Sequence, residues 1–324
     1  MSRSQSAVGI IEKGLSFIGA VFCTKVTISS LLWLWKHFGP NCSLTSYGAG
    51  SSGYVLITGA SDGIGRGIAE EAAYKGFNII LVARDTRKLS DVSCFIKEKT
   101  GVDVRTVSVD CSRDTHETYA SIVRSCEGLD VSVVIHNVGV TNTLPLRFSD
   151  HSERLVNDIV TTNTLFAVKL TKYMLPILER RAEEEFETQN GKKKRAAIVF
   201  VSSLMSLLPS PFFPLYSSSK AFINQFVRSL RCELKTSHPR IDVTLFCPAQ
   251  VCTRMSGISE PSFFVPSPRV YARRLWGFIG RGYGVVSSYT PHALLCLLAA
   301  LMPERLLSVL CRSAFEPKAA NVRV

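Results

Sequence analysis

Paired cysteines are missing from the sequence. Its ten cysteines are scattered between Cys23 and Cys311, and no two of them form a C-x-x-C pair. No group of cysteines and histidines has the spacing of a zinc site either. The sequence therefore argues against a metal centre, a redox dithiol and a secreted disulfide framework. We expect most of the cysteines to be small buried hydrophobic residues in a reducing compartment.

Acidic residues are also few. The 26 aspartates and glutamates are outnumbered by 38 lysines and arginines, which gives a formal net charge of +12. This charge suggests an anionic partner (a phosphate-rich cofactor, a CoA thioester, a lipid headgroup surface or nucleic acid) or simply a basic solvated surface. Nucleic acid would need more basic surface and stacking aromatic side chains than the charged segment between Glu179 and Arg195 supplies. We expect that segment to be a solvated loop and predict no nucleic-acid partner.

Internal repeats are absent too. Apolar residues make up 46% of the chain and aromatic residues 9%, which fits neither a disordered chain nor a repeat array. One large α/β domain takes about 250 residues. The 324 residues therefore leave room for an appendage at each end.

The N-terminal appendage contains a mostly apolar run, Gly14 to Trp35, long enough to cross ~30 Å of hydrocarbon. Lys25, near its middle, costs about 2.5–3.5 kcal/mol on insertion scales unless it snorkels. Trp33 and Trp35 suit a headgroup-level anchor. We expect residues 1–40 to be an uncleaved membrane anchor. A cleaved signal peptide and a helix buried in the main domain are the alternatives.

The Gly- and Ser-rich stretch 41–53 reads as a linker to a main domain at 54–288. In the tail, 289–324, Ala293 to Cys311 holds two short apolar stretches split by Pro303. Neither is long enough to cross a bilayer alone. We expect a bent interfacial helix or a cover over the substrate site.

Between the ends, strand-like and helix-like segments alternate. The strand-like runs are continuously apolar, as expected of strands buried on both faces of a parallel sheet. They are Tyr54–Thr58, Asn78–Ala83, Val104–Asp110, Val131–Asn137, Ala196–Ser203, Val243–Ala249 and the weaker Tyr283–Ser288. Amphipathic helices are expected from Ile64 to a stop at Gly76, from Asp158 to Leu178, and from Tyr216 to Lys235. This order predicts a Rossmann-type, doubly wound α/β fold of about seven strands, with its ligand at the carboxyl ends of the strands.

A glycine-rich turn follows the first strand and opens the first helix. Glycines allow positive φ and a close approach of the backbone to phosphate oxygens, and the helix N-terminus offers free N–H groups. In this strand–turn–helix context the pattern predicts a dinucleotide site. Its residues are Gly59, Ser61, Asp62, Gly63, Ile64 and Gly65.

The second strand ends at Ala83-Arg84 rather than at a carboxylate. A carboxylate there would bind the ribose hydroxyls of NAD, whereas Arg84 can pair with the 2′-phosphate of NADP. NADPH is therefore the expected cofactor. Asp85 weakens this inference if it, rather than Arg84, faces the adenosine. Asp110, at the end of the third strand, can accept a hydrogen bond from the adenine amine.

Three residues form a candidate catalytic group. Tyr216 and Lys220 are four residues apart and share one face of a helix. A nearby ammonium lowers the pKa of a phenol towards the working range, so Tyr216 can pass a proton to a carbonyl oxygen as hydride reaches the carbon. Ser203, at a strand end, can hydrogen-bond the developing oxyanion. Lys220 can also hold the nicotinamide ribose.

The glycine turn, Ser203, Tyr216 and Lys220 together resemble the short-chain dehydrogenase/reductase family. His136-Asn137-Val138-Gly139 is similar to the family's NNxG motif, and Pro248 to Thr253 is similar to its PGxVxT segment. The resemblance implies that Asn137 and the Val251 backbone contact the cofactor, that Thr253 meets the pyrophosphate, and that Asn163 holds a proton-relay water. Two departures are His136 for the first asparagine and Ala249 for the glycine after Pro248.

Finer features resemble the branch that contains very-long-chain 3-oxoacyl-CoA reductases and 17β-hydroxysteroid dehydrogenases of the endoplasmic reticulum. They are the NVG variant, the TGASDGIG turn, Pro266-Ser267-Pro268 and the terminal run Tyr289 to Leu294. The resemblance implies reduction of 3-oxoacyl-CoA in fatty-acid elongation, with the catalytic domain in the cytosol and other elongation enzymes or a second copy as possible partners. Steroid or retinoid dehydrogenation and a catalytically idle scaffold are the alternatives. Ser262 to Val265 is a candidate substrate lid or an ordinary loop.

Overall fold

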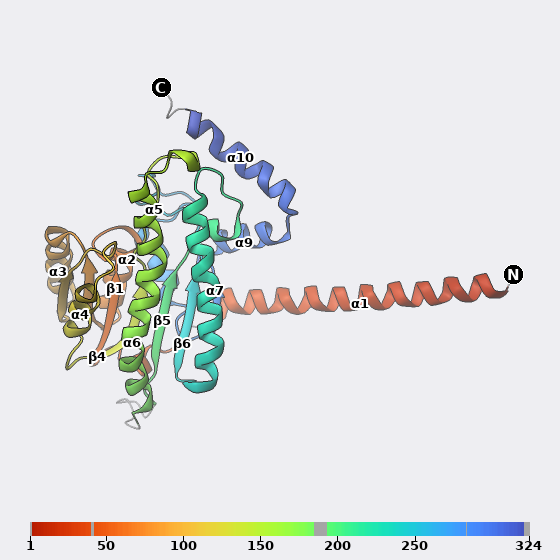
Figure 1. Cartoon of the computed structure of the whole chain (residues 1–324). Helices are drawn as coiled ribbons and strands as arrows, with labels where there is room; N and C mark the ends of the chain where they lie inside the picture. Colours follow the sequence, from red (N-terminus) through yellow and green to blue (C-terminus); the bar gives the residue numbers. More distant parts are fainter. Residues whose placement is uncertain (1, 40–41, 185–192, 283, 321–324) are drawn as a thin grey trace. The chain divides into compact units, whose positions relative to one another are not determined.

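The structure is a computed structural model that describes residues 2–39, 42–184, 193–282 and 284–320. It divides into two compact units, Met1–Asn41 and Cys42–Val324 (Figure 1). The middle of the charged segment, 185–192, lies outside the described residues, as does Tyr283. The beginning of that segment is not a loop as expected, because α6 (Phe166–Glu183) continues through it.

The first unit is one long helix, α1 (Ser2–Phe38). Its segment Glu12–Trp35 contains an 18-residue stretch with a mean hydropathy of 1.7, and the segment is long and apolar enough to cross a membrane. Large apolar side chains along it are exposed within the unit, for example Phe17 and Trp35. The predicted run Gly14 to Trp35 lies within this helix.

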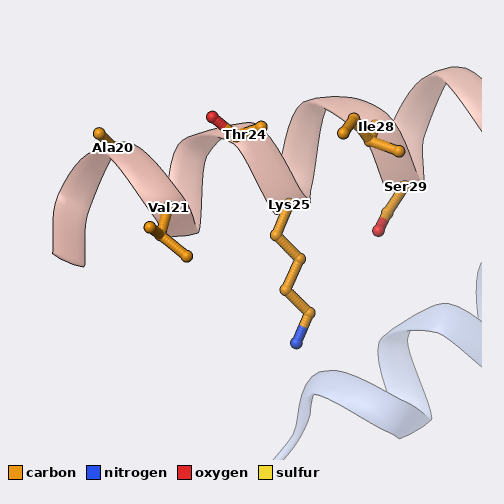
Figure 2. Close-up of a pocket in the computed structure, with 6 residues that line it drawn as sticks. All are labelled: Ala20, Val21, Thr24, Lys25, Ile28 and Ser29. Atoms are coloured by element: carbon orange, nitrogen blue, oxygen red, sulfur yellow. The ribbon is translucent and has the colours of Figure 1, made fainter. Parts of the chain in front are cut away.

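A shallow hollow runs along α1 and is lined by Ala20, Val21, Thr24, Lys25, Ile28 and Ser29. Figure 2 shows Val21, Lys25 and Ser29 on the same side of the helix, as their four-residue spacing requires. The Lys25 side chain extends away from the helix axis (Figure 2). An extended lysine of this kind can reach towards polar surroundings while its methylene stem stays on apolar surface.

The second unit is built on a parallel sheet of seven strands in the order β3-β2-β1-β4-β5-β6-β7. The predicted doubly wound α/β fold is confirmed. The strands are β1 (Gly53–Thr58), β2 (Asn78–Ala83), β3 (Val104–Ser108), β4 (Asp130–His136), β5 (Ala196–Val201), β6 (Ile241–Phe246) and β7 (Val285–Val286). Several were predicted to end one to three residues later, because buried residues such as Ser203 follow the last residue of the strand.

Helices cover both faces of the sheet. On one face lie α2 (Gly63–Tyr74), α3 (Thr86–Thr100) and α8 (Pro268–Trp276), and on the other lie α4 (His116–Ser125), α6 and α7 (Pro214–Ser237). Figure 1 shows α6 and α7 in front of β5 and β6. Along β1 the side chains alternate between the two cores, with Val55 and Ile57 on the α2 side and Leu56 on the α7 side. Burial on both faces explains the continuous hydrophobicity of the strands.

The helix predicted from Asp158 begins earlier and is irregular. It starts as α5 (Glu153–Val160), where the Ser152 hydroxyl caps the N-terminus by accepting a hydrogen bond from Leu155 N at 3.2 Å. A π-helical turn, Thr161–Leu165, then joins α5 to α6. Such turns insert one residue into a helix and are frequent at functional sites. Asn163 lies in this turn.

The stretch that reads as a linker is packed against the main domain from Leu44 to Ala49. Tyr47, in the short 3₁₀ turn Thr45–Tyr47, is only 1% exposed and its hydroxyl donates to the Asp242 carboxylate. Arg195 Nη2 lies 2.7 Å from the same carboxylate. These contacts fasten the approach to β1 against the amino-terminal end of β6.

The C-terminal tail forms two helices, α9 (Thr290–Leu301) and α10 (Glu304–Ala320), which separate at Pro303 as proline geometry favours. Both carry large exposed apolar side chains, which are Leu294, Leu297, Leu298, Leu301, Leu306, Val309 and Leu310. Phe315 of α10 packs on Phe213, with ring centroids 5.4 Å apart. The tail therefore contacts the main domain and still presents apolar surface.

Candidate active site

The carboxyl ends of β1, β4, β5 and β6 bring the predicted site residues to one edge of the sheet. The glycine turn follows β1, Asn137 follows β4, Ser203 follows β5 and the segment with Val251 and Thr253 follows β6. In a doubly wound sheet this edge, near the change in strand order, is where ligands bind.

The glycine turn is compact enough to require its glycines. Gly59 has φ +67° and Gly63 has φ +53°, in the left-handed region that favours glycine. A Cβ on Gly65 would lie 2.2 Å from the Gly59 carbonyl oxygen. Asn137 supports the turn by donating its Nδ2 to Thr58 O at 3.0 Å and Gly59 O at 3.3 Å. Asn137 therefore shapes the turn from the neighbouring strand.

Asp62 caps the N-terminus of α2, the helix that follows the glycine turn. Its Oδ1 accepts a hydrogen bond from Gly63 N at 2.8 Å, while Oδ2 lies 2.6 Å from Arg254 Nη2 and 3.4 Å from Lys88 Nζ. Thr253 also lies against this turn, since a Cβ on Gly63 would come 3.2 Å from its Cγ2. The glycine turn, Thr253 and the cations Arg254 and Lys88 are therefore neighbours, an arrangement that suits an anionic ligand.

The remaining turn residues Ser61 and Ile64 are half-buried, and Ile64 packs on the core. Val251 is 3% exposed and its carbonyl accepts a hydrogen bond from Ser256 Oγ at 2.7 Å. The Val251 backbone is therefore held in place by the loop that follows it.

Arg84 and Asp85 have different surroundings at the end of β2. The Asp85 carboxylate caps α3 by accepting a hydrogen bond from Lys88 N at 3.1 Å. Arg84 is exposed. Because the Asp85 side chain is engaged by its own helix, the guanidinium of Arg84 is the group available at this strand end.

Asp110 is held in its ionised form. Partial burial raises its pKa, but hydrogen bonds from the backbone and hydroxyl of Ser112 and the charges of Arg84 and Arg113 outweigh this and lower it. An ionised carboxylate is an acceptor only. Asp110 can therefore accept from an amine, as predicted from its place after β3.

Tyr216, Ser203 and Lys220 converge at the start of α7. Tyr216 is 9% exposed, Ser203 9% and Lys220 5%. The Lys220 ammonium lies 5.8 Å from the centre of the Tyr216 ring and donates to Val201 O at 3.1 Å. Gly139 leaves room for it, because a Cβ there would come within 3.2 Å of Nζ. A phenol, an ammonium and a hydroxyl thus lie close together in one buried group.

The pKa of Tyr216 differs from the sequence-based expectation. Burial raises its pKa, and hydrogen bonding with Ser203 is the influence that opposes this, rather than the Lys220 charge. Burial also lowers the pKa of Lys220 to about 8. At neutral pH Tyr216 is therefore a phenol with a proton to give, beside an amine that is mostly still charged.

Asn163 binds the backbone behind Lys220. Its Oδ1 accepts from Val140 N at 2.8 Å, and its Nδ2 donates to Val140 O and Ser219 Oγ, both at 2.9 Å. A Cβ on Gly139 would lie 3.3 Å from Asn163 Oδ1 as well as close to Lys220 Nζ. The π-helical turn thus brings Asn163 next to the lysine, where the family resemblance had put it.

His136, one of the two departures, is fully enclosed. Its Nε2 lies 3.0 Å from Thr171 Oγ1, whose own hydrogen goes to Ala167 O, so Nε2 is the protonated nitrogen. The ring stacks on Phe200 with centroids 4.5 Å apart, and burial lowers its pKa to about 3. His136 is therefore a neutral core residue and does not face the site.

This burial predicts a pH effect on stability. Since the unfolded chain protonates His136 below about pH 6.5 and the folded chain only near pH 3, stability present above pH 6.5 is lost as the pH falls. We expect the loss to be about 2 kcal/mol between pH 7 and pH 5. Urea unfolding of the wild type and His136→Gln should differ in their pH dependence by this amount. The exposed His116→Gln is the control, and equal slopes for wild type and His136→Gln would refute the assignment.

Several buried polar groups were not predicted from the sequence. Ser202 Oγ donates to Asn224 Oδ1 at 2.6 Å, and Asn224 Nδ2 donates to Ser206 Oγ at 2.7 Å. Asn142 is 3% exposed and donates to Phe212 O at 2.9 Å, at a residue with φ +67°. The only hint in the sequence was the polar character of these positions on otherwise apolar faces.

A groove of about 500 Å³ opens next to Ser203 and Tyr216. It lies between the loop after β5, the first turns of α7, and α10. It contains Met205 and Ser206, which follow Ser203, and Ser217, which adjoins Tyr216. On α10 it reaches Ser308 and Arg312. The groove is thus lined by apolar side chains, by serine hydroxyl groups and by the guanidinium of Arg312.

Comparison with known proteins gives three findings. The family model for short chain dehydrogenases matches residues 53–261. A very-long-chain 3-oxoacyl-CoA reductase of Scheffersomyces stipitis is 35% identical over 256 residues, which are 78% of this chain and 72% of the relative. One of Kluyveromyces lactis is 34% identical over 282 residues, 86% of this chain and 78% of the relative.

Among solved structures, a short-chain dehydrogenase from Sphingobium yanoikuyae in complex with NADPH superimposes with a TM-score of 0.64 at 26% identity. The match covers 76% of this chain and 91% of that one. A 7beta-hydroxysteroid dehydrogenase superimposes with a TM-score of 0.69 at 19% identity, covering 83% and 98% of the two chains. The second similarity shows the common fold.

Proposed function

The chain belongs to the short-chain dehydrogenase family, and we propose that it is an NADPH-dependent reductase of very-long-chain 3-oxoacyl-CoA. The observation that carries the proposal is the buried group of Tyr216, Ser203 and Lys220 beside a glycine turn. The names of the relatives supply the substrate class. The product is a 3-hydroxyacyl-CoA, an intermediate of fatty-acid elongation.

The residues of the site fit a dinucleotide phosphate. Gly59, Gly63 and Gly65 allow the turn to pack closely, because a Cβ on any of them would meet neighbouring protein atoms, and α2 begins in this turn. Thr253 and Asn137 complete the turn, Asp110 can accept from the adenine, and Lys220 can hold the nicotinamide ribose. When bound, NADPH supplies the hydride. The Sphingobium relative in complex with NADPH supports this choice of cofactor.

The proton of the reaction comes from Tyr216. Burial keeps the phenol protonated at neutral pH, so that it can donate to the carbonyl oxygen as negative charge develops there. Ser203 donates a hydrogen bond to the same oxygen. The Lys220 ammonium stabilises the phenolate left on Tyr216, and Asn163 holds the backbone next to Lys220.

Arg84 sets the choice between NADPH and NADH. A charge-assisted hydrogen bond to the 2′-phosphate is worth about 1.5–3 kcal/mol. We therefore expect Arg84→Ala to raise the KM for NADPH at least about tenfold and to leave the KM for NADH within about twofold. Arg87→Ala is the matched control, because Arg87 is also exposed and lies in the first turn of α3. An unchanged KM for NADPH in Arg84→Ala would mean that another cation reads the phosphate.

The membrane holds the enzyme close to its substrate. The exposed apolar residues of α1 fit a bilayer span, and those of α9 and α10 fit an interfacial contact. We place the protein in the endoplasmic reticulum membrane with its catalytic unit in the cytosol. Other elongation enzymes and a second copy are the partners to test.

The groove that ends at Arg312 can take the polar arm of the substrate. The reacting carbonyl of a 3-oxoacyl-CoA is close to the thioester, so the acyl chain and the CoA arm must leave the catalytic group in different directions. The groove's hydroxyl groups and its cation suit the phosphate-bearing arm. The apolar residues of the 262–265 segment suit the acyl chain.

Substrate assays separate the remaining functions. Membranes from cells that express the protein are supplied with NADPH and either a long-chain 3-oxoacyl-CoA or an oxosteroid. NADPH oxidation with the acyl-CoA alone is the expected result, and oxidation with the oxosteroid alone would favour a 17β-hydroxysteroid dehydrogenase. Oxidation with neither, nor with a retinoid, would favour a catalytically idle scaffold.

A further inference from the structure

His292 is completely buried at the first turn of α9 and joins two loops of the active site. Its Nδ1 accepts a hydrogen bond from Ala249 N at 3.2 Å, and its Nε2 donates to Phe264 O at 2.9 Å. Both partners are main-chain groups. The side chain thus bridges the loop after β6 to the 262–265 segment.

The two partners fix the protonation state of the ring. An N–H group can only donate and a carbonyl can only accept, so both bonds exist together only in the neutral ring with its proton on Nε2. Burial lowers the pKa of His292, against the opposing influence of the Phe264 carbonyl, and so favours this neutral form. The ring packs edge-on against Tyr289 with centroids 5.0 Å apart. His292 is therefore held in one orientation.

The loop after β6 is fastened at Ala249 and again at Cys252. Ala249 precedes Val251 and Thr253, and Cys252 N donates to Pro266 O at 3.0 Å. Ala249 stands where the family has glycine, and its N–H has His292 as its partner. Displacement of His292 would therefore free the backbone next to the proposed cofactor contacts.

The 262–265 segment is a small closed turn with exposed aromatic side chains. Ser262 N donates to Val265 O at 2.8 Å, and Val265 N donates back at 3.1 Å. Phe263 is 71% exposed and Phe264 50%. Tyr289, at the start of α9, donates its hydroxyl to Phe263 O at 2.9 Å. Two side chains at the start of α9, Tyr289 and His292, therefore help to hold this turn to the rest of the domain.

We propose that His292 is a positioning residue that holds the cofactor loop and the 262–265 segment in one fixed arrangement over the acyl chain. This rests on the proposed function, since the segment has a substrate to cover only if the chain is a lipid reductase. His292 contacts neither reacting group and acts through Ala249 and Phe264. The start of α9 thereby controls the position of the substrate cover.

Three substitutions separate the two hydrogen bonds. His292→Asn can keep the acceptor for Ala249, His292→Gln can keep the donor for Phe264, and His292→Phe keeps neither. Tyr289→Phe removes only the neighbouring bond to Phe263 O. The readout is hydrogen–deuterium exchange of the full chain in detergent, which requires no activity.

We expect exchange in the peptide around Ala249 to speed up at least about tenfold in His292→Phe and His292→Gln but not in His292→Asn. Exchange in the 262–265 segment should speed up in His292→Phe, His292→Asn and Tyr289→Phe but not in His292→Gln. Exchange in β1 and α3 should stay unchanged, which verifies the fold. Unchanged exchange at both loops in His292→Phe would overturn the positioning role.

The kinetic readout separates this proposal from the proposed function. With a long-chain 3-oxoacyl-CoA, His292→Phe should raise KM about tenfold and lower kcat less than threefold, and His292→Gln should recover most of the KM. Equal losses in kcat for all three substitutions would overturn positioning of substrate. If the wild type does not reduce acyl-CoA but the exchange pattern holds, the proposed function fails while the bridge between the two loops stands.

Discussion

Replacing Tyr216 with phenylalanine should lower kcat at least about 100-fold, which is the usual contribution of a positioned general acid. The substitution removes one oxygen from a buried side chain and keeps the ring that lies 5.8 Å from Lys220 Nζ. The pocket should therefore keep its shape. Turnover of a long-chain 3-oxoacyl-CoA and the dissociation constant for NADPH are the two measurements.

The NADPH dissociation constant should change less than about threefold in Tyr216→Phe, because the phenol acts on the substrate carbonyl. Tyr119→Phe is the matched control, since Tyr119 is also buried and loses a hydroxyl that donates to Asp114 at 2.8 Å on the α4 side. It should keep normal turnover. Near-normal turnover in Tyr216→Phe would remove Tyr216 as the proton donor.

Replacing Lys220 with methionine should lower kcat/KM at least about 100-fold, because the phenolate formed on Tyr216 then lacks its neighbouring positive charge. Methionine keeps the length of the stem. Lys220→Arg should not restore activity, since Gly139 and Val201 O leave the ammonium little room and a guanidinium is larger and planar. Recovery in Lys220→Arg would mean that any positive charge suffices.

The same lysine predicts the alkaline side of the pH profile. Burial lowers the pKa of Lys220 to about 8, so the ammonium is the main form below that pH and is lost above it. Wild-type kcat/KM should therefore decrease as the pH rises through about 8. The residual activity of Lys220→Met should lack this decrease. A profile that is flat up to pH 9 in the wild type would contradict the role of the charge.

Features set by nearby residues could be predicted from the sequence. The glycine turn and the four-residue spacing of Tyr216 and Lys220 depend on local backbone geometry. Most strands could be found because they are apolar on both faces, although β3 carries exposed polar residues. Several carboxyl ends were placed too late, since buried residues such as Ser203 follow the last residue of the strand.

Three helices on the sheet, α3, α4 and α8, were not predicted although their N-caps were readable. Asp85, Thr115 and Ser267 each accept a hydrogen bond from the third residue beyond them. Recognition of Asp85 as a cap would also have settled which residue of Arg84-Asp85 is free at the strand end.

Contacts between residues far apart in the chain could not be predicted. His292 meets Ala249 across 43 positions, and Asn142 meets Phe212 across 70. Nothing local marks a histidine as a partner of a distant main-chain N–H. The raised pKa of Tyr216 could not be predicted for the same reason, because the burial that raises it comes from several elements that are distant in the chain.

The most direct test of the account follows the hydride itself. NADPH carrying deuterium at C4 of the nicotinamide is incubated with a long-chain 3-oxoacyl-CoA and the full chain, and the acyl product is analysed by mass spectrometry. The account predicts one deuterium at C3 of a 3-hydroxyacyl-CoA in the wild type and almost none in Tyr216→Phe. Equal deuterium incorporation with both proteins, or none with either, would contradict it.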